Sequence, residues 1–329
     1  MENFIEQLKQ SGLLGRSGSN FPVWKKWEAV KGAVSVKKFV ICNASEGEPD
    51  VFKDAFILEN YLPEVINGVK IAIGEVGAST AYIYLNKNFY QKFKQKIINL
   101  IDNSPIELFE KPNGYLAGEE TAILNAIEGK RIEPRIKPPF PTEKGLWSQP
   151  TLINNVETFY WINKIAKGEY NHNRFYCISG ETTNKGVFEL PENYTIEQIL
   201  KETKNYPTKP LDYFYQIGGG GAGEIMLDNE LNQPIKGLAS IAIFSKKTDL
   251  MALLMKWADF FGNENCDQCV PCREGFYRIK EILQQVQGKI CENDKQTLQE
   301  IFDVLEKTSL CPFGRTAYKP FKSALEKLF

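Results

Sequence analysis

The stretch Glu264–Gly275, ENCDQCVPCREG, decides how the end of this chain must fold. It places Cys266, Cys269 and Cys272 three residues apart, and a fourth cysteine, Cys311, precedes a proline further along the chain. The C-x2-C-x2-C run and the Cys-Pro pair are both typical of 4Fe-4S ligands. Zinc is the rival metal, although zinc sites usually combine one C-x2-C pair with a second, distant pair of ligands. A disulfide framework would need a secreted chain. The spacing therefore predicts an iron-sulfur cluster.

Helical periodicity surrounds these cysteines. Apolar residues recur at helical intervals in two groups: Ile279, Leu283 and Val286, then Leu298, Ile301, Phe302 and Leu305. Asp294 could cap the second of these helices. The cysteine loop would join two helices, and Cys311 would lie where a third ends. A helical bundle over residues 248–329 is expected to bring the four thiolates together.

The residues before this bundle predict an α/β protein. Within 1–167, strands are expected at 37–42 and 80–85, and helices at 62–76, 89–101 and 120–128. Proline crowds residues 134–150; its fixed φ and missing N–H exclude helix and central strand, so a rigid extended loop is expected. Residues 168–247 carry three strand-like runs, 174–180, 213–218 and 239–245, and a helix at 196–202, which predicts a small α+β domain.

Composition excludes several classes of function. The chain holds 40 basic and 41 acidic residues, so no global field attracts nucleic acid. No segment approaches the roughly 18 apolar residues of a membrane span, and none has a signal peptide pattern, so a cytoplasmic protein is expected. Cys42, Cys177 and Cys291 are expected to be buried free thiols. The single histidine, His172, is expected at the surface, which favours redox chemistry carried by cofactors over histidine acid-base catalysis.

Three polar loops are candidates for ligand binding. Gly12–Trp27 combines glycines with cations and a phenylalanine, but taken by itself a flexible surface turn is the favoured interpretation. Asn43–Asp54 follows a predicted strand, where α/β folds place ligand loops; a solvated acidic turn is the alternative. Gly114–Thr121 puts two glutamates at a helix start, where the macrodipole alone would favour them.

A fourth glycine-rich segment, Gly218–Gly223 (GGGGAG), matches G-x-G-x-x-G. A dinucleotide fingerprint would need a helix opening on the third glycine and an acidic residue about 20 positions further on. The following EIMLDNELNQP is short and strand-like. A glycine turn is therefore predicted.

Taken in order, these segments resemble the NADH-binding flavoprotein subunit of respiratory complex I and its relatives in NAD-linked hydrogenases and formate dehydrogenases. The matching stretches cover nearly the whole chain: GLLGRSGSNFP, ICNASEGEP, GYLAGEETAI, RIKPPFP, TLINNVET, ENCDQCVPCREG and LCPFG. The resemblance implies a Rossmann-like FMN-binding domain over 1–167, a small β-grasp domain of the soluble-ligand-binding type over 168–247, and a C-terminal helical bundle over 248–329 that carries a 4Fe-4S cluster.

The resemblance also assigns cofactor ligands by matching position, and no catalytic side chain. The FMN residues would be Gly15, Arg16, Gly18, Lys26, Asn43, Glu46, Gly118, Glu119, Asn154 and Asn155. The NADH residues would be Phe21, Glu48, Tyr115, Glu120, Lys137 and Phe140. The cluster ligands would be the four cysteines Cys266, Cys269, Cys272 and Cys311.

The implied activity is that of an NADH dehydrogenase, or diaphorase, which passes a hydride to FMN and single electrons to the cluster. The expected partners are a 2Fe-2S thioredoxin-fold subunit and a larger iron-sulfur subunit, with a membrane reached only through the complex. A first alternative is the diaphorase subunit of a soluble hydrogenase, formate dehydrogenase or bifurcating complex.

A second alternative is a non-catalytic scaffold or electron relay with a decayed flavin site, motivated by departures from the family pattern. Ser17 and Asn20 replace two glycines of the usual GRGGAGF loop, and Ser45 and Gly47 stand where the family usually has aspartate and serine.

Overall fold

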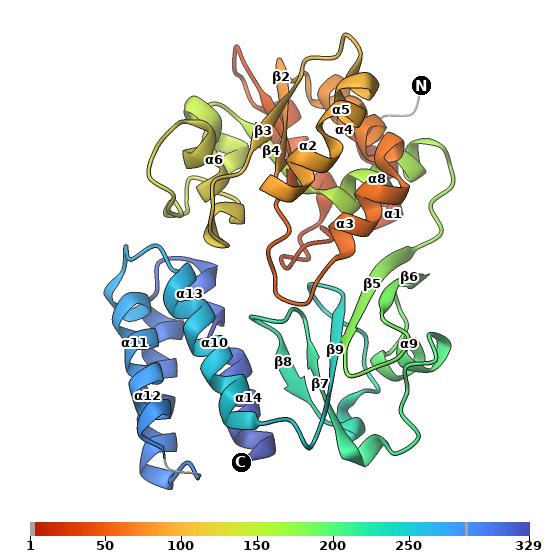
Figure 1. The fold of residues 1–329 in the computed structure, drawn as a ribbon. Coiled ribbons are helices and arrows are strands. Elements are labelled where there is room, and N and C mark those ends of the chain that lie inside the picture. Colours follow the sequence, from red (N-terminus) through yellow and green to blue (C-terminus); the bar gives the residue numbers. More distant parts are fainter. Residues whose placement is uncertain (1–3, 287–288) are drawn as a thin grey trace.

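The computed structural model describes residues 4–286 and 289–329. Three parts follow one another along the chain: a parallel sheet with its helices, a mixed sheet with one helix, and a group of helices (Figure 1). Figure 1 shows the mixed sheet, in green, and the helical part, in blue, on the same side of the parallel sheet. Across the described residues, no helix combines the length and apolarity needed to cross a lipid bilayer.

The parallel-sheet part has four strands in the order β3-β2-β1-β4. Their bounds are β1 (Phe39–Ala44), β2 (Thr80–Leu85), β3 (Ile106–Glu110) and β4 (Thr151–Asn155). All neighbouring pairs are parallel, with Phe39 of β1 opposite Thr80 and Thr151. Because every strand runs the same way, the loops that follow the strands meet at one carboxyl edge.

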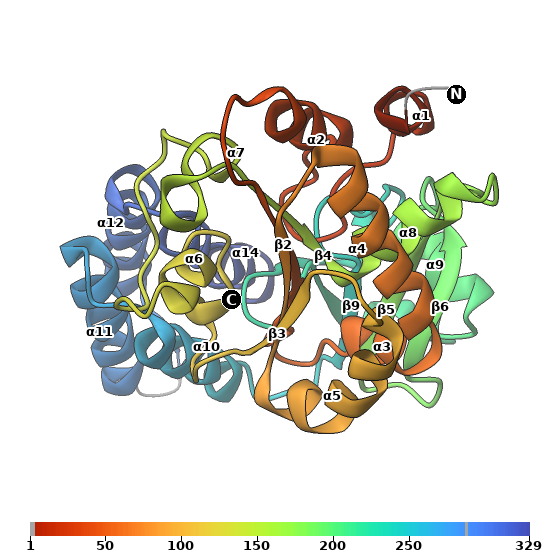
Figure 2. The same ribbon diagram turned by 90° about the horizontal axis from the view of Figure 1, so that it is seen from above.

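Helices cover both faces of this sheet (Figure 2). Alternate residues of β1 point to opposite sides, as the two-residue period requires. Val40 and Cys42 pack with the helices of the larger layer, whereas Phe39 and Ile41 pack with Ile123 on the other face. The larger layer consists of α1 (Phe4–Ser11), α2 (Val23–Gly32), α3 (Lys53–Asn60), α4 (Leu62–Val76), α5 (Lys87–Ile101) and α8 (Val156–Ala166). The smaller one holds α6 (Ala122–Ile127).

The mixed-sheet part has five strands in the order β6-β5-β9-β7-β8. Their bounds are β5 (Asn173–Gly180), β6 (Gly186–Pro191), β7 (Tyr213–Ile217), β8 (Glu224–Met226) and β9 (Ser240–Ser245). The central strands β5 and β9 are parallel, and the other pairs are antiparallel. Helix α9 (Ile196–Glu202) begins with a capping box between Thr195 and Gln198 and buries Ile199 and Leu200 against the sheet.

The helical part has an aromatic core. Its helices are α10 (Leu250–Glu264), α11 (Val270–Gln285), α12 (Glu292–Thr308), α13 (Pro312–Thr316) and α14 (Lys319–Leu328). Phe261 stacks on Phe276 with ring centroids 5.2 Å apart. Helix α14 also closes the β8 edge of the mixed sheet, because Ser323 Oγ accepts a hydrogen bond from Ile225 N at 2.8 Å.

Most expected elements are present, and α4 and α9 have the predicted bounds. The prediction that residues 134–150 exclude helix is wrong, because the one-turn helix α7 (Pro141–Lys144) and a 3-10 turn at Leu146–Ser148 lie within them. Pro141 stands in the first turn of α7, where no backbone N–H is needed.

The expectations for single residues have mixed outcomes. His172 is exposed, and Cys42 and Cys177 are buried, as expected. The expectation that Cys291 is buried is wrong: it lies exposed at the start of α12. Asp294 does stabilise the start of α12, as the prediction of a cap expects, but it lies in the first turn of the helix and not before it. Its carboxylate accepts hydrogen bonds from Cys291 N and Sγ.

Candidate functional site

The four cysteines of the predicted cluster come together at one end of the helical part. Cys269 is the residue before α11, and Cys272 lies in the first turn of that helix. Cys311 is the residue before α13. Cys272 and Cys311 are 6% and 9% exposed, while Cys266 and Cys269 are half-buried against the same apolar core.

The downstream cysteine is adjacent to the cysteine loop. A Cβ on Gly314, three residues after Cys311, would lie 3.5 Å from Cys272 Sγ. Burial and the neighbouring thiols Cys269, Cys311 and Cys266 all raise the pKa of Cys272. Cys272 is therefore close to each of the other three cysteines assigned to the cluster.

The surroundings of Cys311 suit a thiolate. Burial raises the pKa of its thiol, but the backbone N–H groups of Gly314 and Phe313 hydrogen-bond the sulfur and lower it. Within residues 4–286 and 289–329, no three His, Cys, Asp or Glu side chains converge tightly enough to hold a single metal ion. A 4Fe-4S cube does not need such convergence, because each of its irons takes a separate cysteine. The donor set therefore fits a cluster.

The second candidate site lies at the carboxyl edge of the parallel sheet. Asn43, near the end of β1, donates from Nδ2 to Gly118 O at 3.1 Å. Its Oδ1 accepts hydrogen bonds from Ser45 N at 3.2 Å and Ser45 Oγ at 2.6 Å. The loops 45–52 and 114–121 therefore meet above β1, as expected for ligand loops of an α/β fold.

Two lysines converge on one glutamate at this edge. Lys26 of α2 pairs with Glu120, and Lys137 Nζ lies 2.8 Å from the same carboxylate. Burial acts to raise the pKa of Glu120, but Lys26 and Lys137 outweigh it and lower the pKa to about 2. Lys137 also lies 3.5 Å from Glu119. The sequence resemblance assigns all four residues to a cofactor, and the structure brings them together.

The glycine-rich loop before α2 offers open backbone and an exposed ring. Gly15 N donates to Phe21 O at 2.8 Å, which closes the loop, and nothing lies within 4 Å of a Cβ built on Gly18. Asn20 adopts φ 50°, a left-handed conformation that asparagine tolerates better than most residues. Phe21 and Phe140 are 43% and 51% exposed. Positively charged side chains, a glycine with free space around it and exposed aromatic rings together suit a ligand that carries phosphate and a planar ring system.

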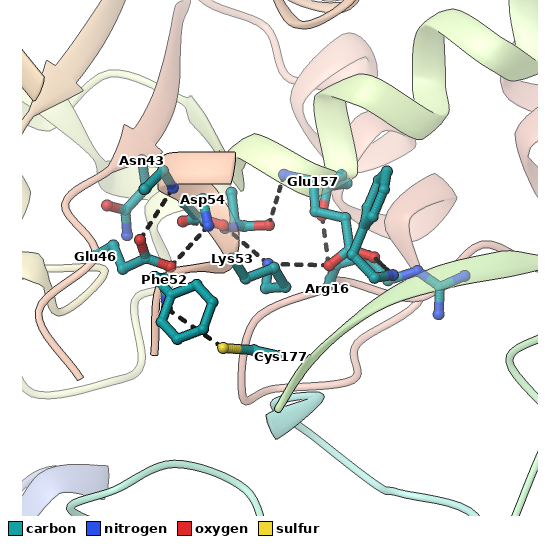
Figure 3. Close-up of polar contacts among 12 residues, drawn as sticks. Arg16, Asn43, Glu46, Phe52, Lys53, Asp54, Glu157 and Cys177 are labelled. Carbon is teal, nitrogen blue, oxygen red and sulfur yellow. Dashed lines mark hydrogen bonds and ion pairs between the residues drawn. The ribbon is translucent and has the colours of Figure 1, made fainter. Parts of the chain in front are cut away.

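Two residues assigned to FMN, Arg16 and Glu46, already have polar partners within the protein (Figure 3). Arg16 is 2% exposed, and its guanidinium hydrogen-bonds Tyr170 Oη at 2.9 Å and pairs with Glu192. Glu46 accepts hydrogen bonds from Asp54 N at 2.7 Å and Ala55 N at 3.0 Å, at the start of α3. Burial and the Asp54 carboxylate raise the pKa of Glu46 to about 8.

A buried ionic network lies beneath these loops. Lys53 Nζ lies 2.9 Å from Asp54 and 2.9 Å from Glu157, and all three side chains are almost fully buried. Asn155 at the end of β4 donates to both Asp54 oxygens at 3.0 and 2.8 Å. Asn155 Oδ1 also accepts from Glu157 N at 2.9 Å, which caps α8. The side chain of Asn155 is therefore held in place from two sides.

Asn154, the residue before it, is satisfied locally. Its amide contacts Trp27 Nε1 at 3.0 Å and Ile153 O at 3.1 Å in the orientation that pairs both groups. Neither Asn154 nor Asn155 therefore has a freely rotating side chain.

Glu48 and Tyr115, both assigned to NADH, bond each other. Tyr115 Oη donates to Glu48 Oε2 at 2.6 Å. The Tyr115 ring lies 5.1 Å from that of Phe260 and 5.9 Å from that of Phe313, between centroids. Because Phe313 bonds Cys311 through its backbone, the loop at the sheet edge reaches the cysteine cluster through this aromatic contact.

The fold and the two sites define a subunit of a flavin- and iron-sulfur-dependent oxidoreductase. Residues 8–164 match the family model of the Nuo51 FMN-binding domain, and residues 252–328 match that of the NADH-ubiquinone oxidoreductase-F iron-sulfur binding region. The F subunit of the NADH-quinone oxidoreductase of Buchnera aphidicola subsp. Schizaphis graminum is 31% identical over 99% of this chain and 82% of its own length. Its counterpart in Aquifex aeolicus is 30% identical over 99% and 84%. The chain belongs to the family of the F subunits of NADH-quinone oxidoreductase.

Hydrogenase subunits are also similar. The NAD-reducing hydrogenase HoxS subunit alpha of Cupriavidus necator is 29% identical over 99% of this chain, which spans 59% of that protein. A crystal structure of an NAD+-reducing [NiFe]-hydrogenase in the H2-reduced state superposes with a TM-score of 0.89 at 26% identity. The match covers 98% of this chain and 61% of the hydrogenase chain.

Proposed function

We propose that this chain is the NADH-oxidising subunit of an electron-transfer complex: it takes a hydride from NADH at FMN and delivers single electrons to a 4Fe-4S cluster. The chemistry that FMN supplies when bound is acceptance of a hydride followed by release of single electrons. The observation that carries the proposal is the contact of Tyr115 with Phe313, because it joins the nucleotide edge to the cysteine cluster within one chain.

The residues assigned to FMN divide into those that would contact FMN and those that would hold the contacting residues in place. Gly15, Gly18 and Gly118 would allow close approach of the backbone, and Lys26 would supply positive charge. The remaining residues proposed to line the FMN site are Asn43, Glu119, Asn154 and Asn155. Arg16 and Glu46 are proposed as supports, because their polar groups are engaged by Tyr170, Glu192 and the start of α3.

NADH would lie over the exposed side of the same edge. Phe21 and Phe140 offer rings for stacking on adenine, and Lys137 can approach phosphate or ribose oxygens. Glu48, Glu120 and Tyr115 complete the proposed nucleotide site. Lys26 and Lys137 hold the pKa of Glu120 at about 2, so its carboxylate is ionised at neutral pH and remains an acceptor for hydroxyl groups.

The proposed division of the chain is residues 1–167 for FMN and NADH, 168–247 for a β-grasp domain, and 248–329 for the cluster. A hairpin, a helix and a parallel pairing of the first and last strands support the β-grasp assignment. Since the chain holds one set of cluster cysteines, electrons would leave to another polypeptide. The proposed acceptors are a thioredoxin-fold 2Fe-2S subunit and a larger iron-sulfur subunit.

A soluble diaphorase is the second candidate function, favoured by the hydrogenase structure with a TM-score of 0.89. Both candidates share the chemistry within this chain and differ only in the complex that receives the electrons. Proteins that copurify with the tagged chain under anaerobic conditions would distinguish them: further complex I subunits favour the first, and hydrogenase subunits favour the second.

An anaerobic NADH titration of the purified, cofactor-loaded protein tests the function. The flavin absorbance should bleach, and an EPR signal of a reduced cluster should appear. Cys311→Ala should abolish the EPR signal and leave flavin bleaching intact, whereas Cys291→Ala, outside the cluster set, should change neither. Protein without flavin, or with flavin that NADH does not bleach, would contradict NADH oxidation and leave only the relay function.

A further inference from the structure

The glycine turn Gly218–Gly223 connects β7 to β8 and faces the parallel-sheet part. Gly221 N and Ala222 N donate to Glu48 Oε1 at 2.8 and 3.1 Å. Gly220 N donates to Pro49 O at 3.1 Å. Three successive backbone N–H groups of this turn thus donate hydrogen bonds to the Glu48–Pro49 segment, which lies about 170 residues earlier in the chain.

Glycine is required in this turn because a larger side chain would collide with neighbouring atoms, and not only because of the backbone conformation. A Cβ on Gly219 would lie 2.4 Å from Glu48 Oε1, and one on Gly220 would lie 2.1 Å from Pro49 O. A Cβ on Gly221 would lie 2.8 Å from Phe260 Cε1 and 3.1 Å from Glu48 Oε1. Gly220 and Gly221 have no left-handed φ, so their only evident need is the close approach of Glu48–Pro49 and Phe260.

The carboxylate of Glu48 is held from three directions. Two N–H groups of the glycine turn bond one oxygen, and Tyr115 Oη bonds the other. A carboxylate offers about four acceptor positions, so about one remains. An acceptor fixed in this way loses little side-chain entropy when a ligand arrives, in contrast to a freely rotating glutamate.

We propose that the glycine turn Gly218–Gly223 is a positioning element of the nucleotide site, which holds Glu48 so that its remaining acceptor position faces a hydroxyl of the bound dinucleotide. This inference rests on the proposed function. It assigns to the mixed-sheet part a role in substrate affinity, although the sequence predicts no cofactor contact for any residue of that part. The turn acts through Glu48 and does not itself touch the nucleotide.

Gly221→Ala tests the proposal, because it adds one methyl group at a position free of backbone strain. The matched control is Gly262→Ala in α10, where nothing lies within 4 Å of the added Cβ. For each cofactor-loaded protein, the flavin content, the cluster EPR signal and the dissociation constant of NAD+ are measured, the last from the change in flavin absorbance. Gly221→Ala should weaken NAD+ binding about three- to tenfold with flavin content and cluster signal unchanged, and Gly262→Ala should change none of the three.

Tyr115→Phe provides a second test, because it removes one donor to Glu48 without adding volume. It should weaken NAD+ binding less than Gly221→Ala does, and it decides the matter if Gly221→Ala does not fold. Folded Gly221→Ala with wild-type affinity for NAD+, or Tyr115→Phe with wild-type affinity where Gly221→Ala is unfolded, overturns the inference. A wild-type protein that binds neither FMN nor NAD+ overturns the proposed function instead.

Discussion

Replacement of Lys53 by methionine should destabilise the protein strongly. Lys53 is buried between Asp54 and Glu157, with its ammonium 2.9 Å from each carboxylate. Burial alone would lower the pKa of Lys53, but Asp54 and Glu157 raise it above its ordinary value, so the residue is charged at neutral pH. Methionine has a similar length and cannot neutralise either carboxylate.

The expected decrease in the free energy of unfolding depends on the partners that Asp54 and Glu157 keep after Lys53 is replaced. Removing one member of a buried charged group costs about 3–5 kcal/mol, because an uncompensated charge stays behind. Asp54 keeps two hydrogen bonds from Asn155, and Glu157 Oε1 keeps those of Trp161 and Phe175. Among the described residues, Glu157 Oε2 forms its ion pair with Lys53 and accepts no hydrogen bond outside that pair, while the guanidinium groups of Arg16 and Arg174 also favour the charged form of Glu157. A loss near the lower limit, about 3 kcal/mol, is expected.

Urea unfolding monitored by circular dichroism measures this loss. The control is Lys31→Met, which removes an exposed pair with Glu75 and should change the free energy of unfolding by less than about 1 kcal/mol. Adding Glu157→Gln to Lys53→Met should recover part of the loss, since it removes the uncompensated charge. If Lys53→Met costs no more than Lys31→Met, the buried network does not stabilise the fold through charge compensation.

Three further outcomes are expected. Glu46, with a pKa raised from 4.5 to about 8, binds its proton more tightly in the folded state, so its contribution to stability falls as pH rises from about 4.5 to about 8. Urea unfolding of Glu46→Gln should show a flatter pH dependence over this range; a slope equal to that of the wild type refutes the raised pKa. Gly68→Ala should destabilise α4 by about 1–3 kcal/mol, because its Cβ would lie 2.0 Å from Phe159 O, whereas Gly74→Ala in open space should stabilise the same helix by up to about 1 kcal/mol in thermal unfolding. Equal effects would contradict the close packing. Cys291 should be alkylated by iodoacetamide in the native protein, as peptide mass spectrometry can detect, while the two buried cysteines outside the cluster set stay unmodified; their modification at the same rate would contradict the burial assigned to them.

Local signals explain which elements the sequence predicts well. Helix α4 has a continuous apolar stripe and ends at Gly77 in a left-handed conformation, so its period and its stop signal are both visible in the sequence. Helix α9 begins with a capping box. Strand β3 is absent from the prediction because only one of its five residues is fully buried, which leaves little alternation to detect. Strand β4 is absent from the prediction as well, although all five of its residues are buried, because uniform burial leaves no alternation to detect.

The sites divide in the same way. The cysteine spacing is local, because three of the four ligands lie within one short loop. The direction of a long polar side chain is not local: Arg16 reaches Tyr170, 154 residues away, and the glycine turn reaches Glu48 across 173 residues. Sequence matching could name Arg16 and Glu46 as ligands, but only the tertiary structure shows the hydrogen bonds that they form within the protein. The segment Gly218–Gly223 is correctly predicted as a turn, but the sequence does not indicate that its backbone N–H groups bond Glu48.

The contacts between the three parts explain how the carboxyl edge of the parallel sheet and the four cysteines keep their relative position. Glu264, at the end of α10, accepts a hydrogen bond from Tyr115 N, and Arg131 donates to Cys266 O at 2.8 Å. Together with the bonds of Glu48 to the glycine turn, these contacts each use a backbone group on one side. Apolar contacts such as that of Tyr115 with Phe260 favour association but are non-directional, whereas hydrogen bonds to fixed backbone groups set orientation. The position of the cysteines relative to the proposed nucleotide site therefore depends on the carboxylates of Glu264 and Glu48 and on the guanidinium of Arg131.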